Sequence, residues 1–236
     1  MPPTIVLVHG AFAESASWDR VIDPLLGADH RVIAAANPLR GPASDAAAVS
    51  DLVRTVEGPV VLVGHSYGGM VITNVDPGAG EIVGLVYVSA FAPEAGENCI
   101  GLAERFPGST LADALKPTPR SDGTTDLTIV QDRFHDQFGA DLPVAITHRM
   151  ACTQRPVTQE ALTEGSGEPL WKKVPSWFLI GEEDRNIPAA LQRFMADRAG
   201  ATRSVPIEGG SHAIAVSNPE ATADLILEAA AVPVAA

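Results

Sequence analysis

The sequence predicts an α/β protein whose mainly parallel, doubly wound sheet has about six strands and carries a helical cap insertion. Short aliphatic runs alternate with longer stretches of helical periodicity, which is the pattern of strands joined by crossover helices. Several of the short runs are apolar at consecutive positions, as expected for strands that are buried on both faces of a parallel sheet. One long segment, 93–173, breaks this alternation.

The predicted strands are β-branched or aliphatic runs bounded by Gly, Pro or Asn. They are residues 5–8, 31–34, 60–63, 82–88, 176–180 and 202–206. The helices expected between them have helical spacing or start signals, such as the Ser-Asp pair at 44–45 and the proline at 188. They are residues 17–26, 44–56, 67–75, 188–199 and 218–230.

The segment 93–173 is rich in Pro, Gly, Thr and Asp and contains no run typical of a strand. Short helices are expected within it at 109–115, 132–138, 142–151 and 158–163. About 80 residues are too many for a plain loop, so we interpret the segment as a helical cap or lid. It would be inserted into a core formed by 1–92 and 174–236. A helical decoration without a functional role is the alternative.

The composition is that of a folded domain, because 46% of the 236 residues are hydrophobic and 19% are charged. The 16 Lys and Arg against 29 Asp and Glu give a net charge of −13, which disfavours nucleic acid and anionic membranes as partners. Two cysteines, the lack of a signal-peptide pattern and the lack of any apolar stretch of about 20 residues predict a cytoplasmic protein without a membrane span. Nothing in the sequence indicates an oligomeric state.

The strongest functional signal is the hexapeptide GHSYGG at 64–69, which follows a predicted strand and precedes a predicted helix. The pattern G-x-S-x-G in a strand–turn–helix setting is typical of a nucleophilic serine on a sharp turn. Small residues are needed on both sides of that serine because the strand and the helix approach closely there. We therefore predict that Ser66 is a nucleophile.

A serine hydroxyl is a weak nucleophile at neutral pH and needs a base that is oriented by an acid. Of the six histidines, only His212 lies in a late, glycine-bearing loop after a predicted strand, where the base is expected. The acid is expected after the preceding strand, where Glu182, Glu183 and Asp184 compete. We favour Asp184, which directly precedes the segment leading to the proline-started helix, and keep Glu183 as the alternative.

An oxyanion hole requires two backbone N–H donors. One is expected at Tyr67, directly after the nucleophile, and the other in the loop HGAF at 9–12 after the first strand. The glycine of this loop allows the backbone to present the N–H of Ala11, with Phe12 as the alternative donor. The Phe12 side chain is predicted to contact the substrate, and packing in the core is an equal alternative.

No metal or nucleotide cofactor is expected. The first strand–helix turn has a single glycine and so lacks the dinucleotide-binding fingerprint. The phosphate-binding pattern G-x-x-x-x-G-K-[ST] and the zinc-binding pattern H-E-x-x-H are absent, and Cys99 and Cys152 are isolated in the sequence.

These motifs resemble the α/β-hydrolase superfamily of serine hydrolases along essentially the whole chain. The resemblance rests on HGAF at 9–12, GHSYGG at 64–69, GEED at 181–184 and GSH at 210–212. Within that superfamily the chain looks most like small bacterial carboxylesterases and plant methyl-ester esterases of the salicylate-binding type. The resemblance implies an α/β-hydrolase fold, a catalytic triad of Ser66, Asp184 and His212, oxyanion donors at Ala11 and Tyr67, and no cofactor.

The sequence thus predicts a carboxylesterase that cleaves small, fairly apolar or aromatic esters through an acyl-enzyme. Related hydroxynitrile lyases carry Thr in place of Gly10 and Lys just after the catalytic histidine, where this chain has Ala213, and this difference favours hydrolysis. Two alternatives stay open. The same triad would act on lactone, amide or C–C bonds or as a cofactor-free perhydrolase, or the chain would be a non-catalytic, hydrolase-like module that binds a small ligand.

Overall fold

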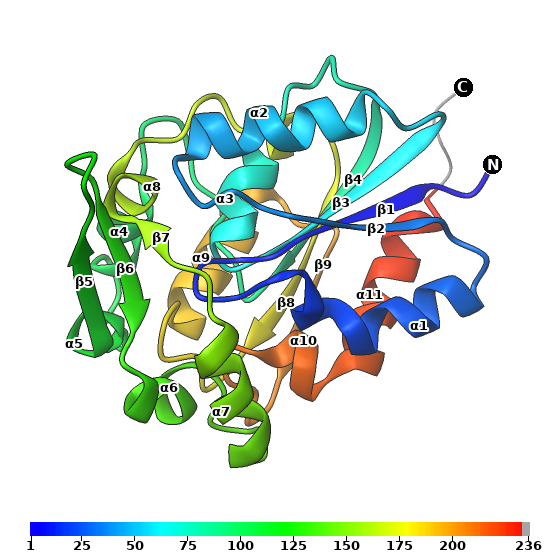
Figure 1. Cartoon of the computed structure of the whole chain (residues 1–236). Coiled ribbons are helices and arrows are strands. Elements are labelled where there is room, and N and C mark those ends of the chain that lie inside the picture. The colour runs from blue at the N-terminus through cyan, green and yellow to red at the C-terminus, as the bar shows by residue number, and fades with distance from the viewer. Residues whose placement is uncertain (233–236) are drawn as a thin grey trace.

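The computed structural model describes residues 1–232 and has a central six-stranded sheet between two layers of helices (Figure 1). The strand order is β2-β1-β3-β4-β8-β9, and every neighbouring pair is parallel. The strands are β1 (Thr4–Val8), β2 (Val32–Ala35), β3 (Pro59–His65), β4 (Glu81–Val88), β8 (Ser176–Gly181) and β9 (Arg203–Ile207). The predicted doubly wound parallel sheet is therefore confirmed. The last residues of the predicted core, 233–236, lie outside the described residues.

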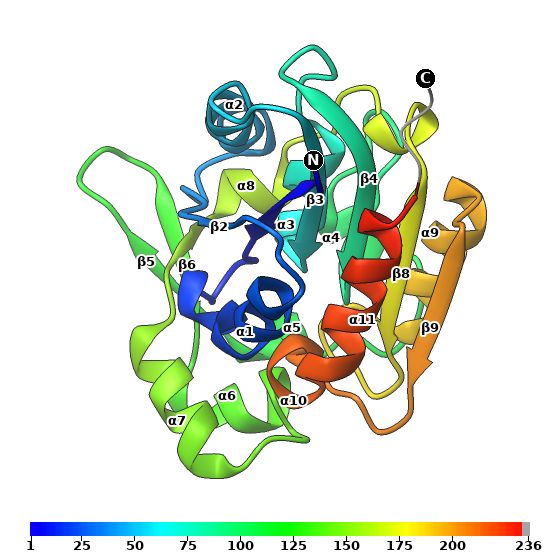
Figure 2. The ribbon, with the colours of Figure 1, turned by 90° about the vertical axis from the view of Figure 1, so that its right-hand side faces the viewer.

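Helices cover both faces of this sheet (Figure 2). Helices α1 and α11 pack together on one face, and α2, α3 and α9 lie on the other. Their bounds are η1 (Ser15–Trp18), α1 (Asp19–Gly27), α2 (Pro42–Val53), α3 (Tyr67–Thr73), α9 (Ala189–Ala199), α10 (Ile214–Ser217) and α11 (Pro219–Ala230). Within residues 1–232, no helix combines the length and the apolar character that crossing a bilayer requires.

Both faces of the sheet are buried, which explains why its strands are apolar at consecutive positions. Along β1, Val6 and Val8 belong to the core shared with α2 and α3, whereas Ile5 and Leu7 belong to the core shared with α1 and α11. All four side chains are fully buried. The same alternation runs through β3, β4 and β8, so each strand joins two hydrophobic cores.

The segment 93–173 leaves the sheet after β4 and returns to it at β8, and it forms the green part of the ribbon in Figure 1. Its helices are α4 (Cys99–Ala103), α5 (Leu111–Ala114), α6 (Gln131–Phe138), α7 (Val144–Thr153), α8 (Gln159–Thr163) and η2 (Leu170–Lys172). Its strands are β5 (Leu115–Pro119), β6 (Thr125–Ile129) and β7 (Val157–Thr158). The segment is thus more than a set of helices.

The expectation of a strand-free insertion was wrong, because β5, β6 and β7 form a three-stranded antiparallel sheet. Pro117 and Pro119 lie in β5 and hide its strand character in the sequence. Proline lacks an N–H donor and is tolerated in a sheet at an edge, and β5 is an edge strand. The strand β7 has only two residues, which is too short for a periodicity signal.

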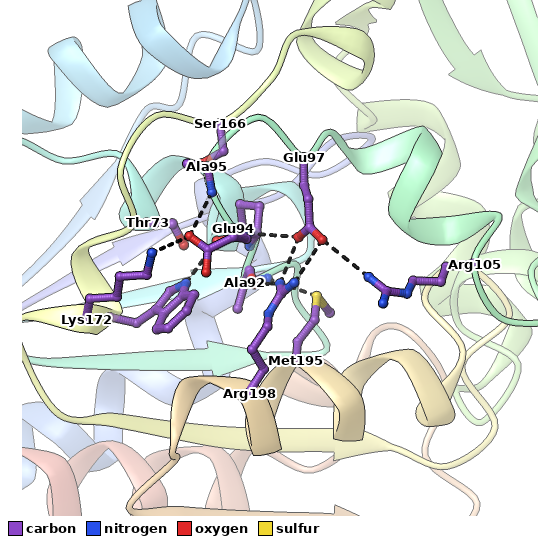
Figure 3. A network of polar contacts seen from close by, with 12 residues as sticks. Thr73, Ala92, Glu94, Ala95, Glu97, Arg105, Ser166, Lys172, Met195 and Arg198 are labelled. Carbon is purple, nitrogen blue, oxygen red and sulfur yellow. Dashed lines mark hydrogen bonds and ion pairs between the residues drawn. The ribbon is translucent and has the colours of Figure 1, made fainter.

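A partly buried ionic network connects the start of this segment to α9 (Figure 3). The Arg198 guanidinium donates to both carboxylate oxygens of Glu97 at 2.8 Å and to the carbonyl of Ala92 at 2.9 Å. Arg105 approaches the same carboxylate at 3.4 Å. Burial alone would raise the pKa of Glu97, but the hydrogen bonds from Arg198 and from the Glu94 N–H, together with the charges of Arg198 and Arg105, hold that pKa below its usual value.

Replacing Arg198 by Met should loosen the first part of the inserted segment, because it removes three charge-assisted hydrogen bonds. We expect a loss of about 2 kcal/mol in unfolding free energy and faster proteolytic cleavage within residues 93–106. The matched control is Arg193→Met, also on α9, which removes a solvent-accessible pair with Glu182 of the loop after β8 and should change stability by less than about 0.5 kcal/mol. Equal effects of the two substitutions on both measurements would contradict this role of Arg198.

Candidate active site

Ser66 occupies a strained turn between β3 and α3. Its backbone has a φ of 56° and a ψ of −124°, a conformation that costs free energy in a non-glycine residue. The turn is closely packed: a Cβ on Gly64 would lie 2.6 Å from the carbonyl of Gly68, and a Cβ on Gly68 would lie 2.3 Å from the carbonyl oxygen of Val8. A side chain at Gly64 or Gly68 would therefore clash with the neighbouring backbone. The close packing that these glycines allow holds Ser66 at the carboxyl end of the sheet.

His212 links Ser66 to Asp184 through its two ring nitrogens. The Ser66 Oγ lies 2.9 Å from His212 Nε2, and His212 Nδ1 lies 2.8 Å from Asp184 Oδ2. Since an ionised carboxylate can only accept, Nδ1 donates to Asp184 and Nε2 is left to accept the serine proton. The three residues come from the turn after β3, the loop after β8 and the loop after β9, and all are buried, His212 to 1% exposure.

The Asp184 carboxylate is fully occupied by hydrogen bonds. Its Oδ1 accepts the backbone N–H groups of Asn186 at 2.7 Å and Ile187 at 2.9 Å. Its Oδ2 accepts the side-chain amide of Gln192 at 3.0 Å besides the His212 ring. Its two competitors in the sequence point elsewhere: Glu183 is exposed and Glu182 pairs with an arginine of α9. The structure thus brings Asp184, and neither glutamate, to His212.

The loop after β1 lies directly against Ser66. A Cβ on Gly10 would come within 2.5 Å of the Ser66 Cβ, so the backbone on either side of Gly10 borders the serine. His9 braces the loop: its Nδ1 donates to the Gly10 carbonyl at 2.9 Å and its Nε2 accepts the Asn37 N–H at 3.2 Å. Burial is the main cause that lowers the pKa of His9 to about 4. Ala11 follows in this loop and is buried.

His65 hydrogen-bonds to the backbone of His212 and so helps to hold its loop in place. Its Nε2 donates to the His212 backbone carbonyl at 2.9 Å, and its ring lies between Trp18 and Phe138. Burial and then the neighbouring His212 lower the pKa of His65 to about 3, so the ring is neutral at ordinary pH. Phe138, from α6 of the inserted segment, forms a T-shaped pair with the His212 ring at a centroid distance of 4.9 Å. One side of the His212 ring therefore packs against an apolar aromatic side chain.

An apolar cavity of about 280 Å³ lies near the site; its lining includes Phe91, Asn186 and Ile187 but none of the Ser66, Asp184 and His212 side chains. Two of its lining residues donate backbone hydrogen bonds to Ser66 and Asp184. The Phe91 N–H donates to the Ser66 carbonyl at 3.2 Å, and the Ile187 N–H donates to the Asp184 carboxylate. Cys99 and Leu162 of the inserted segment also line the cavity. Phe12 is 3% exposed and lines a different cavity, of about 360 Å³, next to α7.

Sequence reasoning missed several polar residues of the site. Asn37, Asn186 and Gln192 are almost fully buried and hold His9 or Asp184 through hydrogen bonds. The sequence held a weak local signal for two of them: Asn37 stands before a proline just after β2, and Asn186 lies two residues after Asp184. Gln192 carries no such signal, since it lies within an ordinary helix and reaches Asp184 only in the folded chain.

This arrangement defines a class. A parallel sheet with a serine on a strained strand–helix turn, and a histidine and a carboxylate delivered from two later loops, is the architecture of α/β hydrolases. Residues 5–225 match the family described as "Alpha/beta hydrolase family". The chain belongs to this family, which confirms the α/β-hydrolase fold expected from the resemblance.

Known relatives are similar along almost the whole chain. Salicylic acid-binding protein 2 of Nicotiana tabacum is 25% identical over 95% of this chain and 96% of that protein. A pyrethroid hydrolase of Sphingobium wenxiniae is 26% identical over 97% of this chain and 88% of that protein. The crystal structure of polyneuridine aldehyde esterase matches with a TM-score of 0.82 at 18% identity, over 97% of this chain and 99% of that one. The resemblance to esterases is confirmed, and a hydrolase of this kind is supported.

Lowering the pH from 7 to 5 should destabilise the protein through the buried side chains of His9 and His65. The pKa values of His9 and His65 fall from 6.5 to about 4 and about 3 on folding, so the unfolded chain binds protons that the folded chain excludes. Above pH 6.5 both rings are neutral in the folded and in the unfolded chain, so this destabilisation is absent. It grows as the pH falls from 6.5 toward the folded-state pKa values of about 4 and about 3. Urea unfolding at both pH values measures this destabilisation.

In His65→Gln, the difference in unfolding free energy between pH 7 and pH 5 should shrink by about 2 kcal/mol relative to wild type. His148→Gln, which removes an exposed imidazole from α7, is the matched control. An unchanged pH difference in His65→Gln would show that the ring takes up a proton in the folded state.

Proposed function

We propose that this protein is a carboxylesterase of the serine hydrolase type, in which Ser66, His212 and Asp184 form a catalytic triad. The observation that carries the proposal is the position of the His212 ring, which contacts Ser66 Oγ through one nitrogen and Asp184 through the other. This is the geometry needed to remove a proton from the serine and to stabilise the imidazolium that results.

In the first half of the reaction, the Ser66 hydroxyl attacks the ester carbonyl while His212 Nε2 takes its proton. The carbonyl oxygen becomes an oxyanion, which the backbone N–H groups of Ala11 and Tyr67 stabilise by hydrogen bonds. When the intermediate collapses, the C–O bond to the alcohol breaks and His212 returns the proton to the leaving alcohol. The acyl group remains on Ser66.

In the second half, water attacks the acyl-enzyme and His212 takes a proton from it. The second tetrahedral intermediate releases the carboxylic acid, and the proton returns to Ser66 Oγ. Asp184 accepts four hydrogen bonds, which fix its carboxylate beside the His212 ring. It holds the His212 tautomer that leaves Nε2 free to act as base.

The proposed substrates are small, fairly apolar or aromatic esters. Support comes from the apolar cavity of about 280 Å³, whose walls Phe91 and Ile187 bond to Ser66 and Asp184. The inserted segment supplies further lining residues of the cavity, including Cys99 and Leu162. We therefore also propose that residues 93–173 act as a cap that shapes the substrate site, on a core formed by 1–92 and 174–236.

Wild-type protein should hydrolyse short-chain aryl esters, and Ser66→Ala should abolish this activity because it removes the nucleophile. Asp184→Asn should lower kcat by about four orders of magnitude, since the amide favours the wrong His212 tautomer. The exposed Ser204 provides the control variant Ser204→Ala, expected to retain wild-type rates. Release of the phenol from a panel of aryl esters measures the activity, with lactones and diketones tested beside them. Equal rates for wild type and Ser66→Ala would overturn the assignment.

Filling the apolar cavity should change the substrate size that is accepted. Ala103 of α4 lines this cavity, and Ala103→Phe should lower kcat/KM for the bulkiest esters by about tenfold or more while leaving acetyl esters little affected. Ala145→Phe places the same side chain at an exposed position of α7 and should leave the profile unchanged. A uniform loss over all esters in Ala103→Phe would show that the substrate does not enter this cavity.

A further inference from the structure

A second buried carboxylate lies close to the site and has no part in the triad. Asp45, in the first turn of α2, is fully buried and accepts the Tyr67 hydroxyl through Oδ2 at 2.8 Å. Its two oxygens also accept the backbone N–H of Arg40, at 3.1 and 3.0 Å, and that of Gly41, at 3.3 Å. A buried charge of this kind is tolerated only when its hydrogen bonds are made, so Asp45 is firmly placed.

Tyr67 is the residue that follows the strained Ser66. Its side chain is 1% exposed, and its backbone begins the short helix α3. Burial and then the negative charge of Asp45 raise the pKa of Tyr67, which keeps the phenol protonated and donating to the carboxylate. The hydrogen bond thus ties the first residue of α3 to a point on another helix, 22 positions away in the sequence.

We propose that Asp45 is a positioning residue for the oxyanion hole. By holding the Tyr67 phenol it fixes the backbone of Tyr67, whose N–H must point at the oxyanion. This inference rests on the proposed function. The reason is geometric: a residue with positive φ such as Ser66 keeps its conformation only when its surroundings over-determine it. Hydrogen bonds to a developing charge also weaken steeply when the donor is misaligned.

Asp45 is itself anchored through Arg40, which several hydrogen bonds hold in place. Arg40, whose N–H binds Asp45, donates from Nη1 to Asp126 of β6 at 2.7 Å and from Nη2 to the Pro156 carbonyl at 3.1 Å. Thr158 of β7 donates its hydroxyl to the Arg40 carbonyl at 2.8 Å. The segment around Arg40 is therefore held between the small antiparallel sheet and the helix that carries Asp45, which makes the carboxylate a rigid support for the phenol.

The test compares Tyr67, at the start of α3, with Tyr87 of β4, whose hydroxyl contacts the last residue of α3. Tyr67→Phe removes the hydrogen bond to Asp45 at the start of α3. Tyr87→Phe removes an equally buried bond, from the Tyr87 hydroxyl to Thr73 Oγ1 at 2.9 Å, at the end of α3. We expect Tyr67→Phe to lower kcat for an aryl ester by about tenfold or more with KM within about twofold. Tyr87→Phe is expected to retain wild-type kcat, even where the two variants lose similar stability.

A second readout separates positioning from folding. An aryl trifluoromethyl ketone forms a hemiketal with the serine, and its oxygen occupies the oxyanion position. Its inhibition constant should rise in Tyr67→Phe by the same factor as kcat/KM falls, and should not change in Tyr87→Phe. Asp45→Asn is expected to act in the same direction, and the double variant should be no slower than the slower single variant, because both act through one bond.

The outcomes distinguish this inference from the function on which it rests. Wild-type kcat and inhibitor affinity in folded Tyr67→Phe would overturn the role of Asp45 and leave the esterase assignment intact. Equal losses in Tyr67→Phe and Tyr87→Phe would also overturn it, because a general loosening of α3 would then explain both. If Tyr67→Phe does not fold, Asp45→Asn carries the same comparison. Ester turnover that survives Ser66→Ala would instead refute the proposed function.

Discussion

The site depends on how closely β3, α3 and the loop after β1 approach one another around Ser66. Added Cβ atoms at Gly10 and Gly68 would come within 2.5 Å of the Ser66 side chain and 2.3 Å of the Val8 carbonyl oxygen. Such packing leaves the serine one backbone conformation, with a positive φ, and holds it there. Because Ser66 is fixed in this way, a histidine arriving from a separate loop can be set at hydrogen-bond distance from it.

Much of the main sheet and of the site could be predicted because the signals are local. Consecutive apolar residues mark strands that face two cores, and a serine between glycines after such a strand marks the sharp turn. Ser66, Asp184 and His212 each follow a strand of the same parallel sheet, so their loops necessarily meet at one edge. The spacing that singles them out in the sequence thus has a direct geometric cause.

What could not be predicted depends on contacts between distant segments. The edge strand β5 contains prolines that argue against a strand, and only its pairing with β6 reveals it. Gln192 and Asp45 are ordinary helical residues in the sequence, and their roles come from the partners that they meet, Asp184 and Tyr67. No periodicity or motif encodes such partners, because they are set by how the helices pack on the sheet. The buried polar groups around a site are therefore the part that structure adds.

Covalent labelling of the serine tests the proposed triad most directly. A fluorophosphonate reacts with a serine only when a neighbouring base removes its proton, and peptide mapping by mass spectrometry locates the adduct. Folded wild-type protein should take up one equivalent, on the peptide that contains Ser66, and His212→Ala should take up little. A folded protein that stays unlabelled, or that carries the adduct on another residue, would contradict the assignment of Ser66 as the nucleophile.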